Sequence, residues 1–218
     1  GPNGAGKTAL IAQLSGQLTP DSGRIRFDGR DITTLPMHKR SRRGLARSFQ
    51  ITSLFLDLSV LDNVALAVQA HSGHSFHFWR DARLAADLRE PARAALERVG
   101  LSDRADRPAS ALSHGEHRLL ELAMALAGRP RMLLLDEPMA GLGPEESARM
   151  VEMLRALKQD LTILLVEHDM EVVFALADRI TVLVYGRVIA SGAPDDIRAN
   201  DQVREAYLGE AEEGDGHV

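Results

Sequence analysis

The sequence predicts an α/β protein whose parallel sheet carries a phosphate-binding loop. Two observations support this prediction. Residues Gly1 to Thr8, G-P-N-G-A-G-K-T, fit the phosphate-loop pattern G-x-x-x-x-G-K-[ST]. Three short apolar runs, separated by helical segments, are typical of strands that are buried on both faces of a parallel sheet. These runs are Arg131–Asp136, Thr162–Glu167 and Ile180–Tyr185.

The loop supplies the groups that bind a nucleoside triphosphate. Its glycines let backbone N–H groups curl round phosphates, Lys7 reaches the β- and γ-phosphates, and Thr8 offers a hydroxyl to Mg²⁺. A helix starting near Gly6 points its positive end at the same anion. The candidate nucleotide-binding residues are therefore Gly1, Pro2, Asn3, Gly4, Ala5, Gly6, Lys7 and Thr8.

Such a loop normally follows a buried parallel strand. The chain begins inside the motif and has no initiator Met, so we expect it to lack the strand that precedes the loop. Without that strand, backbone groups of the neighbouring strands would lack hydrogen-bond partners. We therefore expect the chain to fold less stably and to bind nucleotide more weakly.

Length and composition narrow the class of protein. The 218 residues suffice for one large domain, or for a domain with a subdomain. The net charge of −5 does not indicate attraction to nucleic acid or to anionic lipid. The absence of cysteine excludes disulfides and thiolate chemistry. No apolar run approaches the roughly 18 residues of a membrane span.

Local patterns predict the other elements. Apolar periodicity continues the helix after the loop over Ala9–Leu18, and Arg24–Phe27 reads as a short strand closed by an Asp-Gly turn. A basic segment, Met37–Arg43, precedes a strand-like stretch that ends at Gln50. From Leu58 to Gly128 the pattern is helical.

Two clusters of charged or ligand-type side chains have simpler interpretations than binding sites. The basic run His38–Arg43 could meet phosphate or lipid headgroups, but a solvated helix face is the preferred interpretation. The His71–His77 segment has no cysteine and no carboxylate before Asp81, so a solvated loop is preferred to a metal site.

Acidic chemistry follows the first of the three apolar runs. Asp136 and Glu137 come directly after its last leucine, and ligands bind beyond the carboxyl ends of strands in an open parallel sheet. Asp136 can hold the Mg²⁺ shell that Thr8 also touches. Glu137 is then free to polarise a water for attack on the γ-phosphate.

A second helix start is a candidate anion site. Ser113 is a plausible N-cap for a helix running to about Ala127, and its hydroxyl with the following amides could bind phosphate. Ser113 to Glu116 also fits the capping box S-x-x-E. The two roles are compatible.

The order of these motifs resembles that of ATP-binding cassette (ABC) ATPases. A phosphate loop, a Gln after a strand (Gln50), the signature Leu112–Glu116, a strand ending in Asp136-Glu137, and His168 after the next strand follow one another. The resemblance implies that Gln50 lies near the metal and the attacking water, and that His168 contacts the γ-phosphate. It thus implies catalytic roles for Gln50, Glu137 and His168, and a Mg²⁺ site formed by Thr8, Gln50 and Asp136.

The chain departs from the family's L-S-G-G-Q signature. His114 replaces the first Gly and Glu116 replaces Gln, while Ser113 and Gly115 remain. The resemblance implies that Ser113, His114, Gly115 and Glu116 bind nucleotide, and we expect the Glu116 carboxylate to turn away from it. Gly143 stands where many relatives have an Asp.

The flanks of the motifs are similar to ATPase subunits of branched-chain amino-acid importers, a group that also contains urea and short-amide importers. G-L-A-R-S-F-Q (Gly44–Gln50), V-E-H-D-M (Val166–Met170) and V-R-E-A-Y-L-G-E (Val203–Glu210) carry this resemblance. The alternatives are a urea or short-amide importer ATPase, and a soluble ABC ATPase that acts on nucleic acid or ribosomes.

The resemblance implies a P-loop NTPase (RecA-like) core, residues 1–210, with a helical subdomain inserted at about 58–128. The polar, acidic composition of residues 211–218 predicts a disordered tail. It implies ATP and Mg²⁺ as cofactors, and an identical or different second ATPase subunit closing head to tail around two ATP. The other partners would be a permease, docking at Phe55 and Leu56, and indirectly a periplasmic binding protein, with no nucleic acid. The expected location is cytoplasmic, on the inner face of the bacterial plasma membrane.

Overall fold

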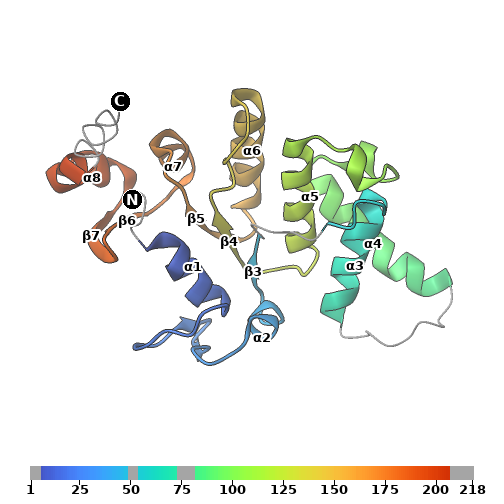
Figure 1. Ribbon diagram of the computed structural model, residues 1–218, viewed down its shortest axis with the longest axis horizontal. Helices are drawn as coiled ribbons and strands as arrows, with labels where there is room; N and C mark the ends of the chain where they lie inside the picture. The colour runs from blue at the N-terminus through green and yellow to red at the C-terminus, as the bar shows by residue number, and fades with distance from the viewer. Residues whose placement is uncertain (1–5, 49–53, 73–81, 207–218) are drawn as a thin grey trace, which may run out of the picture.

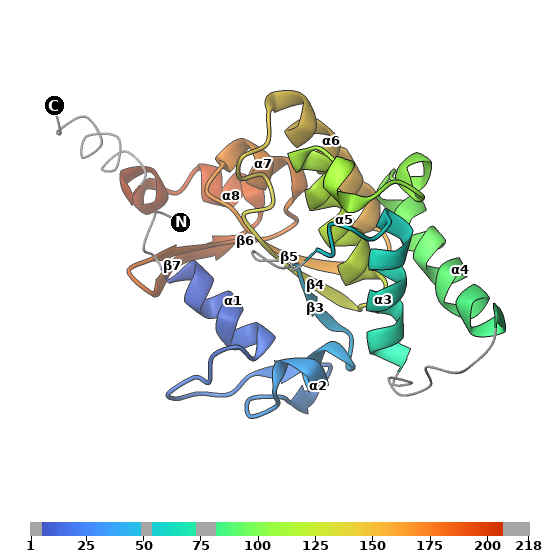
Figure 2. The ribbon, with the colours of Figure 1, turned by 45° about the vertical axis from the view of Figure 1, so that its right-hand side comes forward.

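The computed structural model describes residues 6–48, 54–72 and 82–206 (Figure 1). Strands occupy the middle of the molecule, with α1 (Lys7–Ser15) on one side of them and α6 (Pro144–Leu157) and α7 (Met170–Leu176) on the other (Figures 1 and 2). This layered α/β arrangement agrees with the predicted fold class.

The central sheet consists of three parallel strands in the order β3 (Leu45–Arg47), β4 (Met132–Asp136) and β5 (Thr162–Val166). The apolar runs predicted at β4 and β5 are thus confirmed as parallel strands. Both faces of β4 are covered: Leu133 and Leu135 belong to the main core, whereas Leu134 packs in a smaller core. Burial on both faces explains why the run is continuously apolar rather than alternating.

The third apolar run forms a different pairing from the one that the sequence predicts. Within the described residues, β6 (Ile180–Val184) pairs antiparallel with β7 (Arg187–Gly192). Tyr185 and Gly186 join the strands with φ of 47° and 74°, the paired left-handed geometry of a tight hairpin. The turn folds the chain directly back, so the parallel pairing expected for this run is wrong here.

A cavity of about 920 Å³ lies between the three-stranded sheet and the β6-β7 hairpin. Its walls include the residues of β5 and most of β6, and Lys7 and Leu10 of α1 also line it. The edge of β5 that does not pair with β4 therefore borders open space, next to the start of α1.

The segment between α1 and β3 differs in detail from its prediction. The helix ends at Gly16, which takes the left-handed conformation (φ 87°) of a C-cap, and does not continue to Leu18. The strand expected before the Asp-Gly turn is only two residues long, β1 (Arg26–Phe27), and pairs with β2 (Arg30–Asp31). The turn itself is confirmed, with positive φ at both positions.

The basic run that follows is not uniformly solvated. It forms α2 (Met37–Ser41), in which His38 and Lys39 are exposed but Arg40 is only 2% exposed. The Arg40 guanidinium is buried because backbone carbonyls surround it. The interpretation of the run as a solvated face is therefore wrong for this residue.

The predicted helical region contains three α-helices and two short 3₁₀ turns in the described residues. Its elements are α3 (Val60–Ser72), α4 (Ala82–Arg98), η1 (Ser102–Arg104), η2 (Ala109–Ala111) and α5 (His114–Leu126). The three helices pack on one another and share the main core. His71 lies within α3, with Nε2 2.8 Å from the Ser41 hydroxyl, and does not belong to a solvated loop. Residues 73–77 lie outside the described residues.

Helix α8 (Pro194–Arg198) follows β7, and a short helical segment at 201–206 ends the described part. The predicted tail at 211–218 lies outside the described residues. None of the helices in the described ranges is long and apolar enough to cross a membrane. The division into a core and an inserted subdomain stays a prediction.

Candidate active site

The described part of the phosphate loop is the start of α1. Gly6 is the N-cap residue with φ of 87°, a conformation that favours glycine, and Lys7 is the first helical residue. Thr8 is exposed in the first turn. Gly1, Pro2, Asn3, Gly4 and Ala5 lie outside the described residues. The first amides of a helix have no intrahelical acceptors, so the start of α1 offers the donors that an anion site requires.

Asp136 ends β4 and is almost fully buried, with 6% of its surface exposed. Its Oδ2 accepts from the Arg47 guanidinium at 3.3 Å, while its Oδ1 has no hydrogen-bond partner among the described residues. Burial raises the pKa of Asp136; the Arg47 charge opposes this shift and the Glu137 charge adds to it. One carboxylate oxygen thus remains available for a cation.

Glu137 follows in a strained backbone conformation, with φ of 48°. Its N–H still donates to the Val166 carbonyl at 2.9 Å, which continues the pairing of β4 with β5 by one residue. The left-handed turn directs its side chain away from the strand, and about a third of that side chain is exposed. Such strain at a charged residue beyond a buried strand is typical of a functional position.

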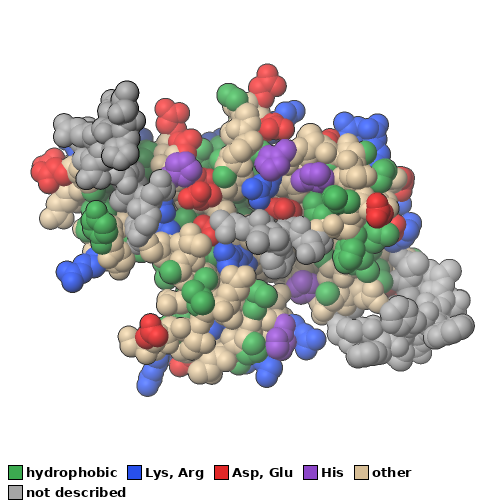
Figure 3. All heavy atoms as spheres, viewed as in Figure 1, with side chains coloured by type: hydrophobic (Ala, Val, Ile, Leu, Met, Phe, Trp, Pro, Cys, Tyr) green, Lys and Arg blue, Asp and Glu red, His purple; other side chains and the backbone are tan. Residues whose placement is uncertain are grey.

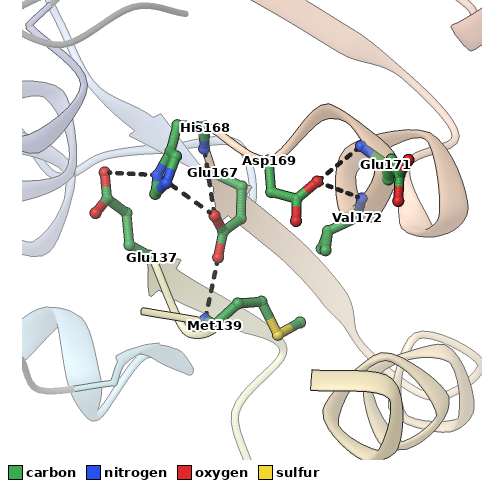
Figure 4. A network of polar contacts seen from close by, with 7 residues as sticks. All are labelled: Glu137, Met139, Glu167, His168, Asp169, Glu171 and Val172. Carbon is green, nitrogen blue, oxygen red and sulfur yellow. Dashed lines mark hydrogen bonds and ion pairs between the residues drawn. The ribbon is translucent and has the colours of Figure 1, made fainter. Parts of the chain in front are cut away.

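His168 lies beyond the end of β5, beside Glu137. Its Nδ1 is 3.6 Å from Glu137 Oε1, and Figure 4 shows the two side chains pointing toward each other. The His168 side chain is more than half exposed. On the face seen in Figure 3, acidic and histidine side chains gather near β5 and α7. A carboxylate and an imidazole therefore face solvent at the carboxyl edge of the sheet.

Glu167 is a member of this network that the sequence reasoning missed. Its carboxylate is buried and accepts from the backbone N–H of Met139 at 3.1 Å and of His168 at 3.2 Å (Figure 4). Burial raises the pKa of Glu167, and these two N–H donors lower it. The available signal was a charged residue continuing an apolar strand, because a carboxylate in that position needs buried partners.

Helix α5 begins as predicted. Ser113 is its N-cap, and its hydroxyl accepts from the Glu116 N–H at 3.2 Å. Glu116 completes the capping box by accepting from the Ser113 N–H at 2.9 Å, and its other oxygen accepts from Arg104 Nε at 2.9 Å. These two interactions hold the pKa of Glu116 below its usual value, the Ser113 N–H contributing most.

Two other residues of the signature segment, His114 and Gly115, also have local partners. Gly115 lies directly against the Glu146 carboxylate of α6, so a larger residue at this position would have to displace that side chain. His114 lies close to Gly141, a left-handed residue in the loop after β4. The segment Ser113–Glu116 is thus packed against the loop that leads from Glu137 to α6.

The described candidate residues lie in three places. Asp136, Glu137 and His168 meet at the carboxyl edge of β4 and β5. Ser113 belongs to α5, which packs on α3 and α4, whereas Lys7 belongs to α1, which packs on β3 and β4. Figures 1 and 2 show α1 and α5 apart. Gln50, the remaining candidate, lies outside the described residues.

Two family models match parts of this chain. A family model described as "ABC transporter" matches residues 1–140, and a model described as "Branched-chain amino acid ATP-binding cassette transporter" matches residues 187–213.

Curated relatives and solved structures are similar over most of their length. The high-affinity branched-chain amino acid transport ATP-binding protein BraF of Pseudomonas aeruginosa is 41% identical over 97% of this chain and 86% of its own. The protein LivG of Escherichia coli, described in the same words, is 38% identical over the same shares. A crystal structure of the ADP conformation of MJ1267, an ATP-binding cassette of an ABC transporter, has a TM-score of 0.81 at 29% identity, covering 95% of this chain and 85% of that one.

Proposed function

This chain belongs to the ABC transporter family of ATP-binding cassettes, and we propose that it hydrolyses ATP to drive an importer of branched-chain amino acids. The observation that carries the hydrolytic role is the meeting of Asp136, Glu137 and His168 at the carboxyl edge of the parallel sheet. The cargo is proposed because the relatives BraF and LivG carry branched-chain amino acid transport in their names.

In the proposed reaction, Lys7 and the amides at the start of α1 hold the β- and γ-phosphates. Glu137 takes a proton from a water molecule, the water oxygen forms a bond to the γ-phosphorus, and the bond to the ADP oxygen breaks. The strained backbone of Glu137 points its carboxylate into solvent, where a water can reach it. His168, 3.6 Å away, is placed to contact the γ-phosphate.

The chain's own residues fit a Mg²⁺ ion. In the part of the chain that the structure describes, one buried carboxylate oxygen of Asp136 has no partner, and a hard cation prefers such an oxygen. Thr8 offers a hydroxyl from the first turn of α1, and we propose Gln50 as a further ligand. When bound, Mg²⁺ would spread the negative charge that develops on the phosphate oxygens.

A second ATPase subunit is part of the proposal. Ser113 and Gly115 belong to a different group of elements from Lys7. The Ser113 and Gly115 that contact a nucleotide held at α1 would therefore belong to a second subunit, placed head to tail. We propose that Ser113, His114, Gly115 and Glu116 close on the partner's nucleotide, and that the partner is this chain or a related one.

The proposed permease contact lies on the segment before α3. Phe55 and Leu56 are 54% and 49% exposed, which is unusual for large apolar side chains. The backbone beneath them is fixed, because buried Asn63 accepts from the Phe55 N–H and donates to the Phe55 carbonyl. Fixed apolar anchors of this kind suit a protein contact. This contact would hold the chain on the inner face of the membrane, with the periplasmic binding protein acting through the permease.

Replacement of the proposed base tests the hydrolytic mechanism. Glu137→Gln should retain ATP binding and lower steady-state turnover by about 10² or more, the scale of a lost general base. The control is Glu145→Gln, which removes the same charge from an exposed position in the first turn of α6. Turnover of Glu137→Gln within about threefold of the control would refute the assignment of the base.

Uptake by cells tests the cargo and the docking surface. Replacing both Phe55 and Leu56 with Asp should abolish leucine uptake while ATP hydrolysis by the isolated subunit continues. Val188→Asp, at another exposed apolar residue, is the control. Normal leucine uptake by the double variant would refute the docking surface. If the intact system imports urea or short amides instead of leucine, the cargo proposal is wrong. It is also wrong if the system imports none of these and the ATPase acts on nucleic acid or ribosomes.

A further inference from the structure

Glu167 occupies an unusual place for a carboxylate. It continues the apolar run of β5, and only 1% of its side chain is exposed. A carboxylate is rarely buried to this extent unless hydrogen bonds compensate for the lost hydration. Its position therefore calls for an explanation in terms of its partners.

Both partners of Glu167 are backbone N–H groups of the loops that carry the reactive side chains. Oε1 accepts from Met139, two residues after Glu137, and Oε2 accepts from His168 itself (Figure 4). Oε2 also lies 3.8 Å from His168 Nδ1. One side chain thus connects the loop after β4 to the loop after β5.

The next residue fixes the other side of His168. Asp169 is the N-cap of α7 and accepts from the N–H groups of Glu171 and Val172 (Figure 4). The backbone of His168 is therefore held between two bonded carboxylates, while its own side chain faces Glu137.

We propose that Glu167 is a positioning residue that sets the distance between Glu137 and His168 by joining the loops that bear them. This inference rests on the proposed role of Glu137 as the base. It gives Glu167 no contact with ATP or water; its effect passes through the backbone of Met139 and His168.

The chemistry of the two partners explains why a carboxylate is needed. Both are donors, so the side chain must offer two acceptor oxygens. A glutamine offers one oxygen and one NH₂ group, which would face an N–H, so one of the two bonds must be lost. An aspartate keeps both oxygens but is one methylene shorter and cannot span the same two amides.

The test compares Glu167→Gln with Glu171→Gln, which makes the same change at an exposed residue in the first turn of α7. We expect kcat for ATP in Glu167→Gln to fall about tenfold or more, because displacement of catalytic groups by about an ångström has effects of this size. KM for ATP should stay within about twofold, because the residues at α1 are unchanged. Glu171→Gln should match the parent protein.

Amide hydrogen exchange provides a second measurement. In the unchanged protein, the Met139 amide should be protected like the amides of β4, and Glu167→Gln should speed its exchange about tenfold or more. If Glu167→Gln does not fold, kcat for ATP and the exchange rate of the Met139 amide are measured on Glu167→Asp instead.

Three results would overturn the inference: kcat of the Glu167 variant within about twofold of the control, a change confined to KM, or fast exchange of Met139 in the unchanged protein. Its failure is distinguishable from failure of the proposed mechanism. If Glu137→Gln is inactive while Glu167→Gln is normal, only the positioning role is wrong; if Glu137→Gln retains activity, the base assignment is wrong.

Discussion

Replacement of Arg40 should destabilise the protein more than replacement of any neighbouring basic residue. The buried guanidinium donates to the carbonyls of Gln13, Leu14, Thr33 and Leu35 at 2.7 to 2.8 Å. Two of these carbonyls end α1, where a cation also complements the helix dipole. Arg40→Met keeps the apolar stem and leaves all four carbonyls without their donor.

The expected loss follows from that count. An unsatisfied buried acceptor costs about 1–3 kcal/mol, and the lower end applies here because methionine no longer requires a charge to be buried. Four carbonyls at about 1 kcal/mol each give a loss of about 4 kcal/mol. For a protein of this size, this corresponds to a fall in melting temperature of roughly 8–16 °C.

Urea denaturation and thermal melting measure this loss, with Arg43→Met as the control. Arg43 is an exposed residue of the same basic run and undergoes the same chemical change. The control should lie within about 0.5 kcal/mol of the parent protein, as most surface substitutions do. Equal stability of Arg40→Met and Arg43→Met would refute the account of the buried guanidinium.

Three further substitutions test other parts of the structure. The folded-state pKa of Glu116 lies below its ordinary value of 4.5, so its contribution to stability is present above that pH and is lost as pH falls through the folded pKa; Glu116→Gln should therefore flatten the fall in melting temperature from about pH 6 to about pH 3, and an unchanged slope would contradict this. Asn63→Ala leaves the N–H and carbonyl of Phe55 without their partner, so the free energy of unfolding should fall by about 1–3 kcal/mol and the Phe55 amide should exchange faster. Arg47→Met leaves the buried Asp136 carboxylate unpaired and should cost about 3–5 kcal/mol in chemical denaturation. Adding Asp136→Asn should recover most of that loss, and additive losses would refute the pairing.

The sequence predicts those parts of the molecule whose structure is determined locally. β4 is apolar at every position before Asp136 because both of its faces are covered, and this pattern is visible without coordinates. The capping box at Ser113 is likewise a local signal, as is the Asp-Gly turn after β1. Each depends on residues a few positions apart, so periodicity and turn chemistry suffice.

Features that depend on distant residues were missed or misjudged. Arg40 looks like its exposed neighbours in sequence, but it donates to carbonyls of α1 that lie more than twenty residues away. Glu167 looks like the solvated end of a strand until Met139 is brought beside it. β6 has the composition of a parallel strand, but a two-residue turn at Tyr185 pairs it with β7. The composition of a segment indicates whether it is buried, but it does not indicate which part of the protein covers it or pairs with it.

The backbone between the proposed docking residues and α5 suggests how the permease and the nucleotide site would communicate. The Leu56 carbonyl accepts from the Ser110 N–H at 3.0 Å, and the Leu58 carbonyl accepts from the Ala109 N–H at 2.9 Å. Ser113, the N-cap of α5, follows only three residues after Ser110. A displacement of the exposed segment must therefore either break these bonds or move the start of α5 with it. Because bonded backbone transmits displacement better than a solvated loop does, we expect motion at Phe55 and Leu56 to reach the signature segment directly.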